Sequence, residues 1–322
     1  MKICIACSAG GHLTEILQLQ DFYNTKNHFF VVPKTKDSEH LSEHEPVYFI
    51  NITYNRLKRL KTIIYLFQNL KILLKEKPDV IITTGAGSAL SMCYLGKLLR
   101  KKIIYIESFA RITTPSLFGK LVAPVSDLII VQWKPLLKYY KKAVYGGPIF
   151  TFQSMTREKK GEYIFITVGI SSFGFERLLK EVDKLIDLRI ITQKVIAQTG
   201  KSKYKPKNYE TIDFLSADKL LELMSKSSVV ITHGGVGSII SALALGEPTI
   251  VVPRYKKFNE CVDNHQLEIT RELEKEGVIL PVYDITHLPE ALRKAEKFKP
   301  KNFTLSEGNI KNIIRNYLKK LF

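Results

Sequence analysis

Three glycines within four residues mark a turn in the second half of the chain, at Gly234, Gly235 and Gly237 in the string HGGVGS. Glycine lets backbone amides approach a ligand closely because it has no Cβ atom. Ser238 opens a predicted helix that runs to Leu245, and the amino end of a helix offers unpaired N–H groups and a positive dipole. A phosphate group suits such a turn, but glycines can also serve the turn alone, and the residues leave both interpretations open. The string is neither a P-loop nor a dinucleotide fingerprint, because GxxxxGK[ST] does not occur and the third glycine of GxGxxG is missing.

Three further glycine turns follow predicted strands. They read SAGGHLTE from residue 8, TGAGS from residue 84 and GISSFG from residue 169. The first contains His12 and Glu15, and Glu107 ends a strand that begins at Ile103. These side chains can take a proton from a reacting hydroxyl group, because histidine titrates near neutral pH and an ionised carboxylate is a base.

Strands and helices alternate along the chain in a way that positions these turns. Short apolar, β-branched runs predict strands, and amphipathic segments predict helices. Strands are expected at 2–7, 29–32, 80–83, 103–107, 128–132, 163–168, 195–198, 229–231 and 249–252, and helices at 15–23, 57–75, 90–99, 175–186, 220–224, 239–245, 268–276 and 310–321. The alternation is typical of doubly wound parallel sheets, whose ligands bind outside the carboxyl ends of the strands, where the glycine turns fall.

The pattern restarts after YGGP at 145–148, which divides the chain. The predicted fold class is α/β, with two doubly wound, Rossmann-like domains at 1–147 and 148–305, and residues 306–322 form a final helix that can pack back on the first domain. A chain of 322 residues is long enough for two domains of ordinary size.

Positive charge dominates the composition, since 49 Lys and Arg against 31 Asp and Glu give a formal net charge of +18. Nucleic acid, anionic membrane surfaces and phosphorylated substrates attract such a protein. Zinc-finger and RRM signatures do not occur, so no nucleic-acid partner is expected. No apolar run reaches the roughly 20 residues that cross a bilayer, and we expect a cytoplasmic protein. The basic helix between Arg56 and Lys77 is either a crossover helix with a solvated face or one that lies on anionic lipid.

The four cysteines, at positions 4, 7, 93 and 261, do not make a disulfide framework in a chain of this length. Cys4 and Cys7 have the C-x-x-C spacing of redox and metal sites, but both stand in an apolar strand and no second Cys/His pair is nearby in the sequence. Small buried residues are the favoured interpretation, and no metal site is predicted.

Longer strings carry a family resemblance. HGGVGSIISALALGEPTIVVPR, with NHQLE from residue 264, resembles the donor-binding domain of family 28 GT-B glycosyltransferases. It is most similar to the catalytic subunit of the two-subunit transferase that adds the second N-acetylglucosamine to a dolichol-linked sugar. The first half, through SAGGHLTE, TGAGS, YIESFAR and QW, resembles the membrane-recruiting subunit of that enzyme. The chain looks like a natural fusion of the two subunits, as in paired bacterial enzymes of capsule and exopolysaccharide synthesis, and more distantly resembles the single-chain transferase that makes peptidoglycan lipid II.

The resemblance implies a GT-B fold, in which two domains face a cleft. It also implies an inverting transfer of a sugar from a UDP-sugar to a sugar on a polyprenyl pyrophosphate, with a β-1,4 linkage as the expected product. It implies no cofactor and no metal, in keeping with the lack of a D-x-D string, because the amino end of a helix holds the leaving diphosphate. The donor-binding residues it implies are Gly169, Ser171, Ser172, His233, Gly234, Gly235, Val236, Gly237, Ser238, Asn264, His265 and Gln266. Of these, Asn264 and Gln266 are the candidates for the sugar hydroxyls. The acceptor-side residues are Gly10, Gly11, Gly85, Gly87, Ser88 and Arg111.

An inverting displacement needs one base to take the proton of the acceptor hydroxyl. The match to the family's GGH turn nominates His12, with Glu15 and Glu107 as rivals and a structural role for His12 in the turn as a further alternative. His233 is expected to be structural or to lie beside a phosphate rather than to act as a base.

Two departures from the family pattern affect the donor and the membrane. The helix after the glycine turn often carries an acidic residue that binds ribose, and Ser241 takes that position here, which leaves the ribose contacts open. We expect no counterpart of the amino-terminal transmembrane anchor of the eukaryotic recruiting subunit. Peripheral attachment to the cytoplasmic face of the membrane is therefore expected to rest on surface helices, with the segment from Arg56 to Lys77 as the best candidate.

The residues alone do not determine which sugar is donated or whether the protein is catalytically active. The donor sugar can be N-acetylglucosamine, galactose or glucuronic acid, and Arg254 with Lys256 would suit a uronate carboxylate, although surface basicity is the simpler account. A UDP-sugar epimerase uses the same fold, and a nucleotide-sugar-binding scaffold without activity is an alternative of a different class.

Overall fold

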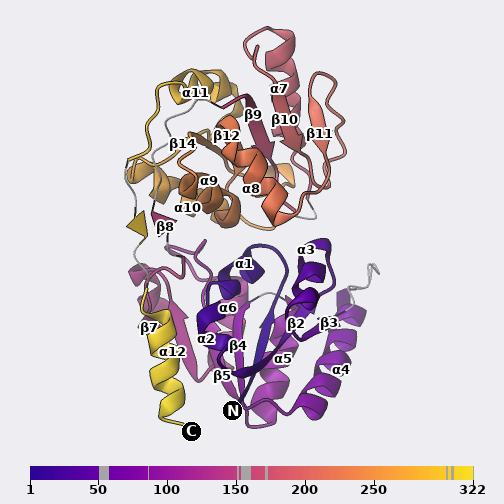
Figure 1. Ribbon diagram of the computed structural model, residues 1–322. Coiled ribbons are helices and arrows are strands. Elements are labelled where there is room, and N and C mark those ends of the chain that lie inside the picture. The colour runs from indigo at the N-terminus through magenta and orange to yellow at the C-terminus, as the bar shows by residue number, and fades with distance from the viewer. Residues whose placement is uncertain are drawn as a thin grey trace. The chain divides into compact units, whose positions relative to one another are not determined.

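The computed structural model describes residues 1–50, 58–85, 87–150, 152–153, 161–170, 173–301, 304–305 and 308–321 (Figure 1). The chain divides into two compact units, each with its own parallel sheet. The first unit consists of Met1–Thr151 together with Ser306–Phe322, and the second of Phe152–Leu305. The last helix of the chain therefore belongs to the first unit.

The first unit contains a seven-stranded parallel sheet in the order β3-β2-β1-β4-β5-β6-β7. Its strands are β1 (Lys2–Cys7), β2 (Asn27–Pro33), β3 (Val47–Ile50), β4 (Val80–Gly85), β5 (Lys102–Ile106), β6 (Leu128–Val131) and β7 (Ala143–Tyr145). Its α-helices are α1 (Gly11–Leu17), α2 (Gln20–Tyr23), α3 (Lys36–Glu39), α4 (Lys58–Glu76), α5 (Gly87–Leu98), α6 (Leu117–Val122) and α12 (Ile310–Lys319).

The second unit contains a six-stranded parallel sheet in the order β11-β10-β9-β12-β13-β14. Its strands are β9 (Tyr163–Thr167), β10 (Val195–Gln198), β11 (Glu210–Ile212), β12 (Ser227–His233), β13 (Thr249–Val252) and β14 (Leu280–Pro281). Its α-helices are α7 (Glu176–Asp187), α8 (Ala217–Ser225), α9 (Val236–Ala244), α10 (His265–Lys275) and α11 (Leu288–Ala295). A separate antiparallel pair joins β8 (Phe152–Gln153) to β15 (Thr304–Leu305).

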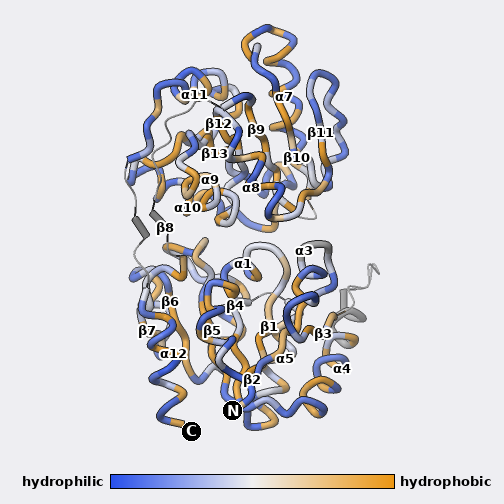
Figure 2. The backbone as a smooth tube through the Cα atoms, in the orientation of Figure 1, coloured by the Kyte–Doolittle hydropathy of each residue, from blue (hydrophilic) through white to orange (hydrophobic). Residues whose placement is uncertain are grey.

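The central strands fold as they do because they are continuous apolar runs. The segments VIITTG of β4 and YIFIT of β9 are buried along their whole length, as expected for parallel strands covered by helices on both faces. Figure 2 shows hydrophobic residues along the central strands, whereas helix α12 alternates between hydrophobic and hydrophilic positions. The apolar positions Ile310, Ile314 and Leu318 of α12 are its buried ones.

Both sheets have the same topology, which fixes where a ligand can bind. In each unit the chain adds two strands outward on one side of the first strand, β1 or β9, and then returns to the other side of it with the fourth strand, β4 or β12. Ligands of doubly wound sheets bind beyond the carboxyl ends of the strands at this point of reversal. The glycine turns after β1, β4, β9 and β12 flank these two points.

The predicted fold class is confirmed, and some predicted boundaries are wrong. Helix α9 begins at Val236, not at Ile239, because Gly235 in an extended conformation is its N-cap. Helix α1 begins at Gly11 rather than Glu15 and ends at Leu17. The short edge strands β7 and β11 are not predicted from the sequence, because they are partly exposed and lack a buried apolar run.

Helix α12 is held to the first unit by backbone and side-chain contacts. The N–H of Asn309 donates to the carbonyl of Gly146 at 2.6 Å, and Lys311 Nζ forms an ion pair with Asp21 at 3.0 Å. Within the ranges described above, no helix is both long and apolar enough to cross a membrane.

Candidate functional site

Gly169 follows β9 at the reversal point of the second unit and is held from two sides by the amide of Gln198. The N–H of Gly169 donates to Gln198 Oε1 at 3.1 Å and to Thr167 Oγ1 at 3.2 Å, and Gln198 Nε2 donates to the carbonyl of Gly169 at 3.2 Å. Gly169 has a φ of +73°, which favours glycine. Its N–H is thus used to fix the turn. Ser171 and Ser172, which were predicted to line the diphosphate, lie outside the described residues.

The turn after β12 leaves a different set of N–H groups for a ligand. The N–H of Gly234 donates to Gln266 Oε1 at 3.1 Å. Val236, Gly237 and Ser238 form the first turn of α9, and N–H groups at that place have no partner inside the helix. An anion would therefore meet these three amides and the positive end of the helix dipole.

The imidazole of His233 lies against both glycine turns. A methyl group at Gly235 would stand 2.2 Å from His233 Nε2, and one at Gly169 would stand 2.5 Å from His233 Cε1. Burial, together with the charge of Arg254, lowers the pKa of His233 to about 3. The ring is therefore neutral at physiological pH, and it fills the space between the two turns.

Residues 264–266, predicted to meet the donor sugar, start helix α10. Gln266 is 6% exposed, and its Oε1 accepts from both Gly234 N at 3.1 Å and Arg254 N at 3.0 Å, so it connects two loops. Asn264 Oδ1 accepts from the N–H of Lys256 at 2.9 Å. His265 Nδ1 contacts Asp263 Oδ1. In this conformation the side-chain oxygens of Asn264 and Gln266 hold the backbone of the site.

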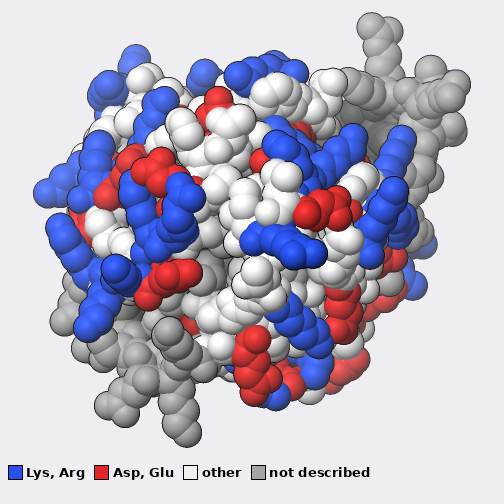
Figure 3. Space-filling view, turned by 90° about the horizontal axis from the view of Figure 1, so that it is seen from above, with Lys and Arg blue, Asp and Glu red and all other residues white. Residues whose placement is uncertain are grey.

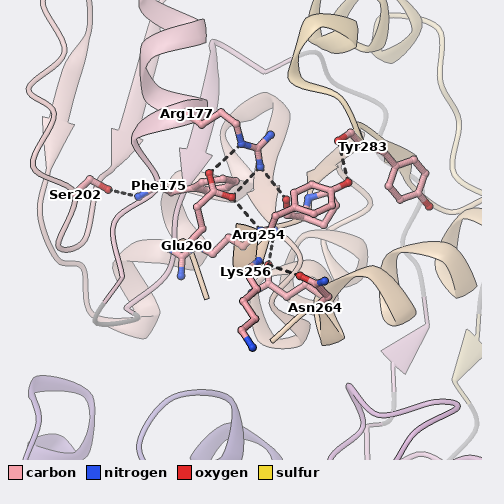
Figure 4. A network of polar contacts seen from close by, with 11 residues as sticks. Phe175, Arg177, Ser202, Arg254, Lys256, Glu260, Asn264 and Tyr283 are labelled. Atoms are coloured by element: carbon pink, nitrogen blue, oxygen red, sulfur yellow. Dashed lines mark hydrogen bonds and ion pairs between the residues drawn. The ribbon is translucent and has the colours of Figure 1, made fainter. Parts of the chain in front are cut away.

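The loop after β13 is fixed by an ion pair that Figure 4 shows in detail. Arg177 of α7 donates from Nε to Glu260 Oε1 at 2.9 Å and from a terminal nitrogen to Glu260 Oε2 at 3.0 Å. The same terminal nitrogen donates to the carbonyl of Pro253 at 3.0 Å, and Glu260 Oε2 also accepts from Tyr255 N at 3.0 Å. These contacts order residues 253–260 beside the glycine turns.

Arg254 in that loop is almost completely buried, with 1% of its surface exposed. A terminal nitrogen of its guanidinium donates to the carbonyl of Val168 at 2.6 Å and to that of Phe173 at 3.4 Å, the two ends of the turn after β9. Burial lowers the pKa of Arg254 to about 10, which leaves it charged at neutral pH. The uronate contact considered for this residue is not available to a side chain in this position.

In the first unit, Glu15 of α1 accepts hydrogen bonds from the loop after β5. Ser108 Oγ donates to Glu15 Oε1 at 2.7 Å, Phe109 N donates to Oε2 at 3.1 Å, and Gln132 Nε2 donates to Oε2 at 3.1 Å. The side chain is 2% exposed, and burial raises its pKa to about 7. Glu15 thus ties α1 to the loop and to β6.

Glu107 is completely buried and accepts four hydrogen bonds. Its Oε1 accepts from Tyr105 OH at 2.7 Å and from Ser108 N at 3.0 Å. Its Oε2 accepts from Ser116 N at 3.1 Å and from Tyr140 OH. Burial, and then the charge of Glu107, raise the pKa of the Tyr140 hydroxyl, which stays protonated as a donor. Both ends of the loop 107–116 are therefore fixed by this one carboxylate.

His12 lies where the turns after β1 and β4 meet. Its Cε1 is 3.4 Å from the position of a methyl group on Gly85, and Thr84 Oγ1 donates to its carbonyl at 2.9 Å. The N–H of Ser8 donates to the carbonyl of Gly85 at 3.1 Å, which joins the two turns. His12 is half-buried, in contrast to the two buried carboxylates.

The remaining acceptor-side predictions fall on the same turns or on the adjoining loop. Gly10, with a φ of +76°, is the N-cap of α1, and Gly11 begins that helix. Gly87 is exposed at the start of α5, followed by the buried Ser88. Arg111 is half-buried in the loop between Glu107 and Ser116.

The amides of Gln132 and Gln198 and the burial of Arg254 are features of the site that the sequence does not predict. Gln132 contacts Glu15 across 117 residues of sequence, and Arg254 contacts Val168 across 86. A polar side chain directly after a buried apolar strand was the one available signal, since both Gln132 and Gln198 stand at strand ends.

Comparison with known proteins identifies both halves of the chain. Residues 3–149 match the family model "Oligosaccharide biosynthesis protein Alg14 like", and residues 163–321 match "Glycosyltransferase family 28 C-terminal domain". The UDP-N-acetylglucosamine transferase subunit ALG14 of Mus musculus is 30% identical over 180 residues, which cover 46% of this chain and 83% of that protein.

A bacterial relative spans the boundary between the two units. The UDP-N-acetylglucosamine–N-acetylmuramyl-(pentapeptide) pyrophosphoryl-undecaprenol N-acetylglucosamine transferase of Clostridium botulinum is 28% identical over 204 residues, 58% of this chain and 56% of that protein. Among solved structures, Acinetobacter baumannii MurG has a TM-score of 0.58 at 15% identity, covering 99% of this chain and all of MurG. The UDP-GlcNAc 2-epimerase of Neisseria meningitidis has a TM-score of 0.70 at 14% identity, with coverage of 99% and 100%. At such identities the structures show the fold alone.

These matches place the protein among GT-B-fold proteins with two Rossmann-like units. The chain belongs to the Alg14-like family in its first half and carries a glycosyltransferase family 28 C-terminal domain in its second. The predicted resemblance to a fusion of two subunits is confirmed to that extent.

Proposed function

We propose that this protein is an inverting glycosyltransferase that moves a sugar from a UDP-sugar to a sugar on a polyprenyl pyrophosphate, with a β-1,4 linkage as the expected product. The observation that carries the proposal is the anion site at the start of α9, in a domain of the glycosyltransferase 28 family. N-acetylglucosamine is the preferred donor sugar, because both relatives named above are UDP-N-acetylglucosamine transferases or subunits of one.

The second unit supplies the electrostatic part of the reaction. As the bond from C1 of the sugar to the diphosphate oxygen breaks, negative charge develops on the leaving UDP. The amides of Val236, Gly237 and Ser238 and the dipole of α9 stabilise that charge. Arg254 adds a positive charge close behind the turn. In this proposal the amides and the arginine take the part that a metal plays elsewhere, and metal independence remains a prediction.

The first unit supplies the base in this proposal. The acceptor hydroxyl oxygen attacks C1 of the sugar on the face opposite the diphosphate, and its proton passes to His12. Glu15 and Glu107 are less suited, because they are buried and their oxygens already accept several hydrogen bonds. His12 is half-buried, and an imidazole titrates near neutral pH.

The test starts with nucleotide binding. UDP, UDP-N-acetylglucosamine, UDP-galactose and UDP-glucuronic acid are titrated by calorimetry with EDTA present, and the tightest donor is then incubated with a polyprenyl-pyrophosphate-linked sugar. We expect binding without metal and a lipid-linked product one sugar longer. Binding without transfer to any such acceptor supports the scaffold instead, and conversion of the free UDP-sugar to its 2-epimer supports the epimerase.

We also propose that the first unit binds anionic membrane through helices α4, α5 and α6. Helix α4 packs beside α5, and α5 beside α6. Large apolar side chains stand exposed on all three: Phe67 is 65% exposed, Leu98 79% and Leu117 72%. Exposed basic residues on or next to the same helices are Lys71, Lys75, Lys97, Arg100 and Lys120. Of the predicted basic segment, Arg56 and Leu57 lie outside the described residues.

Apolar side chains beside lysines suit the headgroup region of an anionic bilayer. On the face in Figure 3, Lys and Arg are interspersed with Asp and Glu.

Co-sedimentation with phosphatidylglycerol-containing vesicles tests the membrane proposal. Phe67→Ser combined with Leu98→Ser should reduce the bound fraction about tenfold, since each substitution removes apolar area from the lipid contact. Leu188→Ser is the matched control, because Leu188 is 58% exposed but belongs to the second unit. Equal binding by the double variant and the control would exclude this surface.

A further inference from the structure

Two arginines of the second unit contact the ring of Phe175, the N-cap of α7, and only one of them forms an ion pair with another described residue. The Cζ atoms of Arg177 and Arg254 lie 5.2 Å and 5.3 Å from the ring centroid. Arg177 forms a two-point ion pair with Glu260. Within the described part of the chain, Arg254 has no carboxylate at ion-pair distance, and its Nε has no hydrogen-bond partner. Two guanidinium groups therefore stand near one carboxylate, and the buried Arg254 has no ion pair of its own among these residues, although the charge of Glu260 acts on it at longer range.

This charge stands directly behind both glycine turns. The Arg254 guanidinium holds the carbonyls of Val168 and Phe173 at the two ends of the turn after β9. Its backbone N–H shares the oxygen of Gln266 with the N–H of Gly234, in the turn after β12. The charge also acts on His233, because it lowers the pKa of that imidazole in addition to the effect of burial.

A buried charge without an ion-pair partner is costly for folding, and an anion bound at the adjacent turns would reduce that cost. The side chain itself cannot touch the anion, because 1% of it is exposed. It can act only through the turn whose carbonyls it holds and through its electric field, which is strong in a low-dielectric interior.

We propose that Arg254 is a positioning residue that shapes the turn after β9 and supplies the buried positive charge that selects a diphosphate over uncharged ligands. The identity of the nucleotide rests on the proposed function, but the charge selection does not. The prediction therefore concerns phosphate groups, and the uridine moiety should be unaffected.

The test measures the binding of inorganic pyrophosphate, UDP and uridine to the full chain by calorimetry. Arg254→Gln should weaken pyrophosphate and UDP at least about tenfold and leave uridine binding unchanged, because only the phosphates interact with the charge. Arg254→Lys keeps the charge but cannot span both carbonyls, so its affinity should fall between those of Gln and the native residue. Arg293→Gln on the exposed part of α11 removes the same charge at the surface and should bind all three ligands normally.

Thermal unfolding of each variant separates this role from general stability. If Arg254→Gln unfolds, Arg254→Lys is the test variant. The proposal is overturned if Arg254→Lys binds pyrophosphate as weakly as expected for a neutral residue and binds uridine equally weakly. Unchanged pyrophosphate affinity in either variant also overturns it. If the native chain binds pyrophosphate but no uridine compound, the proposed function fails, and a loss of pyrophosphate binding in Arg254→Gln still supports the role of Arg254.

Discussion

The two units share one strand order but bury opposite charges where that order reverses. In the first unit the buried groups are the carboxylates of Glu15 and Glu107. In the second it is the cation Arg254, beside the half-buried, neutral ring of His233. The shared topology therefore places a ligand-binding position at the same point of each sheet, and the buried charge determines which ligand each position can bind. The second unit suits a diphosphate, whereas the first suits an uncharged hydroxyl and a base.

The largest effect on the reaction rate is expected at His12, the proposed base in the first unit. His12→Ala should lower kcat by about 100- to 10,000-fold, the usual contribution of a general base. UDP affinity should stay within about twofold of native, because the proposed anion site belongs to the second unit. Steady-state kinetics with a lipid-linked acceptor and UDP calorimetry measure the two. A loss of UDP affinity as large as the loss of rate would contradict the division of roles.

Glu107→Ala tests the claim that the first unit's carboxylates are structural. The change leaves the hydroxyls of Tyr105 and Tyr140 and two backbone N–H groups without their acceptor. Removing one member of a buried charged network costs about 3–5 kcal/mol of unfolding free energy. Urea denaturation measures it, with the exposed Glu210→Ala as control. If the two variants are equally stable, the network carries little of the fold.

Gly235→Ala tests the packing of His233 between the turns of the second unit. The new methyl group would stand 2.2 Å from His233 Nε2, so the ring or the turn must move. Overpacking of this kind costs about 1–3 kcal/mol, and UDP binding should weaken by about tenfold or more. Gly11→Ala is the counterpart in the first unit, since a methyl group there meets nothing within 4 Å. Calorimetry with UDP should separate the two, and equal affinities would argue against a tight turn at Gly235.

The smallest effect is on pH dependence, and it has opposite signs in the two units. The folded pKa of Glu15 is raised to about 7, so the folded state binds more protons and Glu15's contribution to stability falls as pH rises from about 4 to 7. The folded pKa of His233 is lowered to about 3. Its contribution is fully present above the unfolded value of about 6.5 and is lost as pH falls towards 3.

Hydrogen exchange can follow these two trends separately. Between pH 7.5 and 5 the free energy of opening should fall in the second unit and rise in the first, each by on the order of 1–2 kcal/mol, after correction for intrinsic exchange. In Glu15→Gln the pH dependence of the opening free energy of the first unit should disappear, because glutamine does not titrate. Parallel trends in both units would contradict the assignment of opposite buried charges.

The fold was predictable because its signals are local, whereas much of the site was not. Continuous apolar strands and glycine turns appear directly in the sequence. The start of α9 was misplaced because Ser238 is a favoured N-cap residue, while the actual cap is the backbone of Gly235, which leaves no side-chain signal. Arg254 was given a surface role because its burial depends on Val168 and Phe173, more than 80 residues earlier.

Helix α12 gives the chain an unusual order of completion during synthesis. The first unit includes residues at both ends of the chain, and the whole of the second unit lies between them in the sequence. A ribosome therefore releases all of the second unit before the first can receive its last helix. Until then, the surface that Ile310 covers at Gly146, near Ile130, stays exposed to solvent. A nascent chain that stalls before residue 310 would expose this apolar surface, and a chaperone would be expected to bind there.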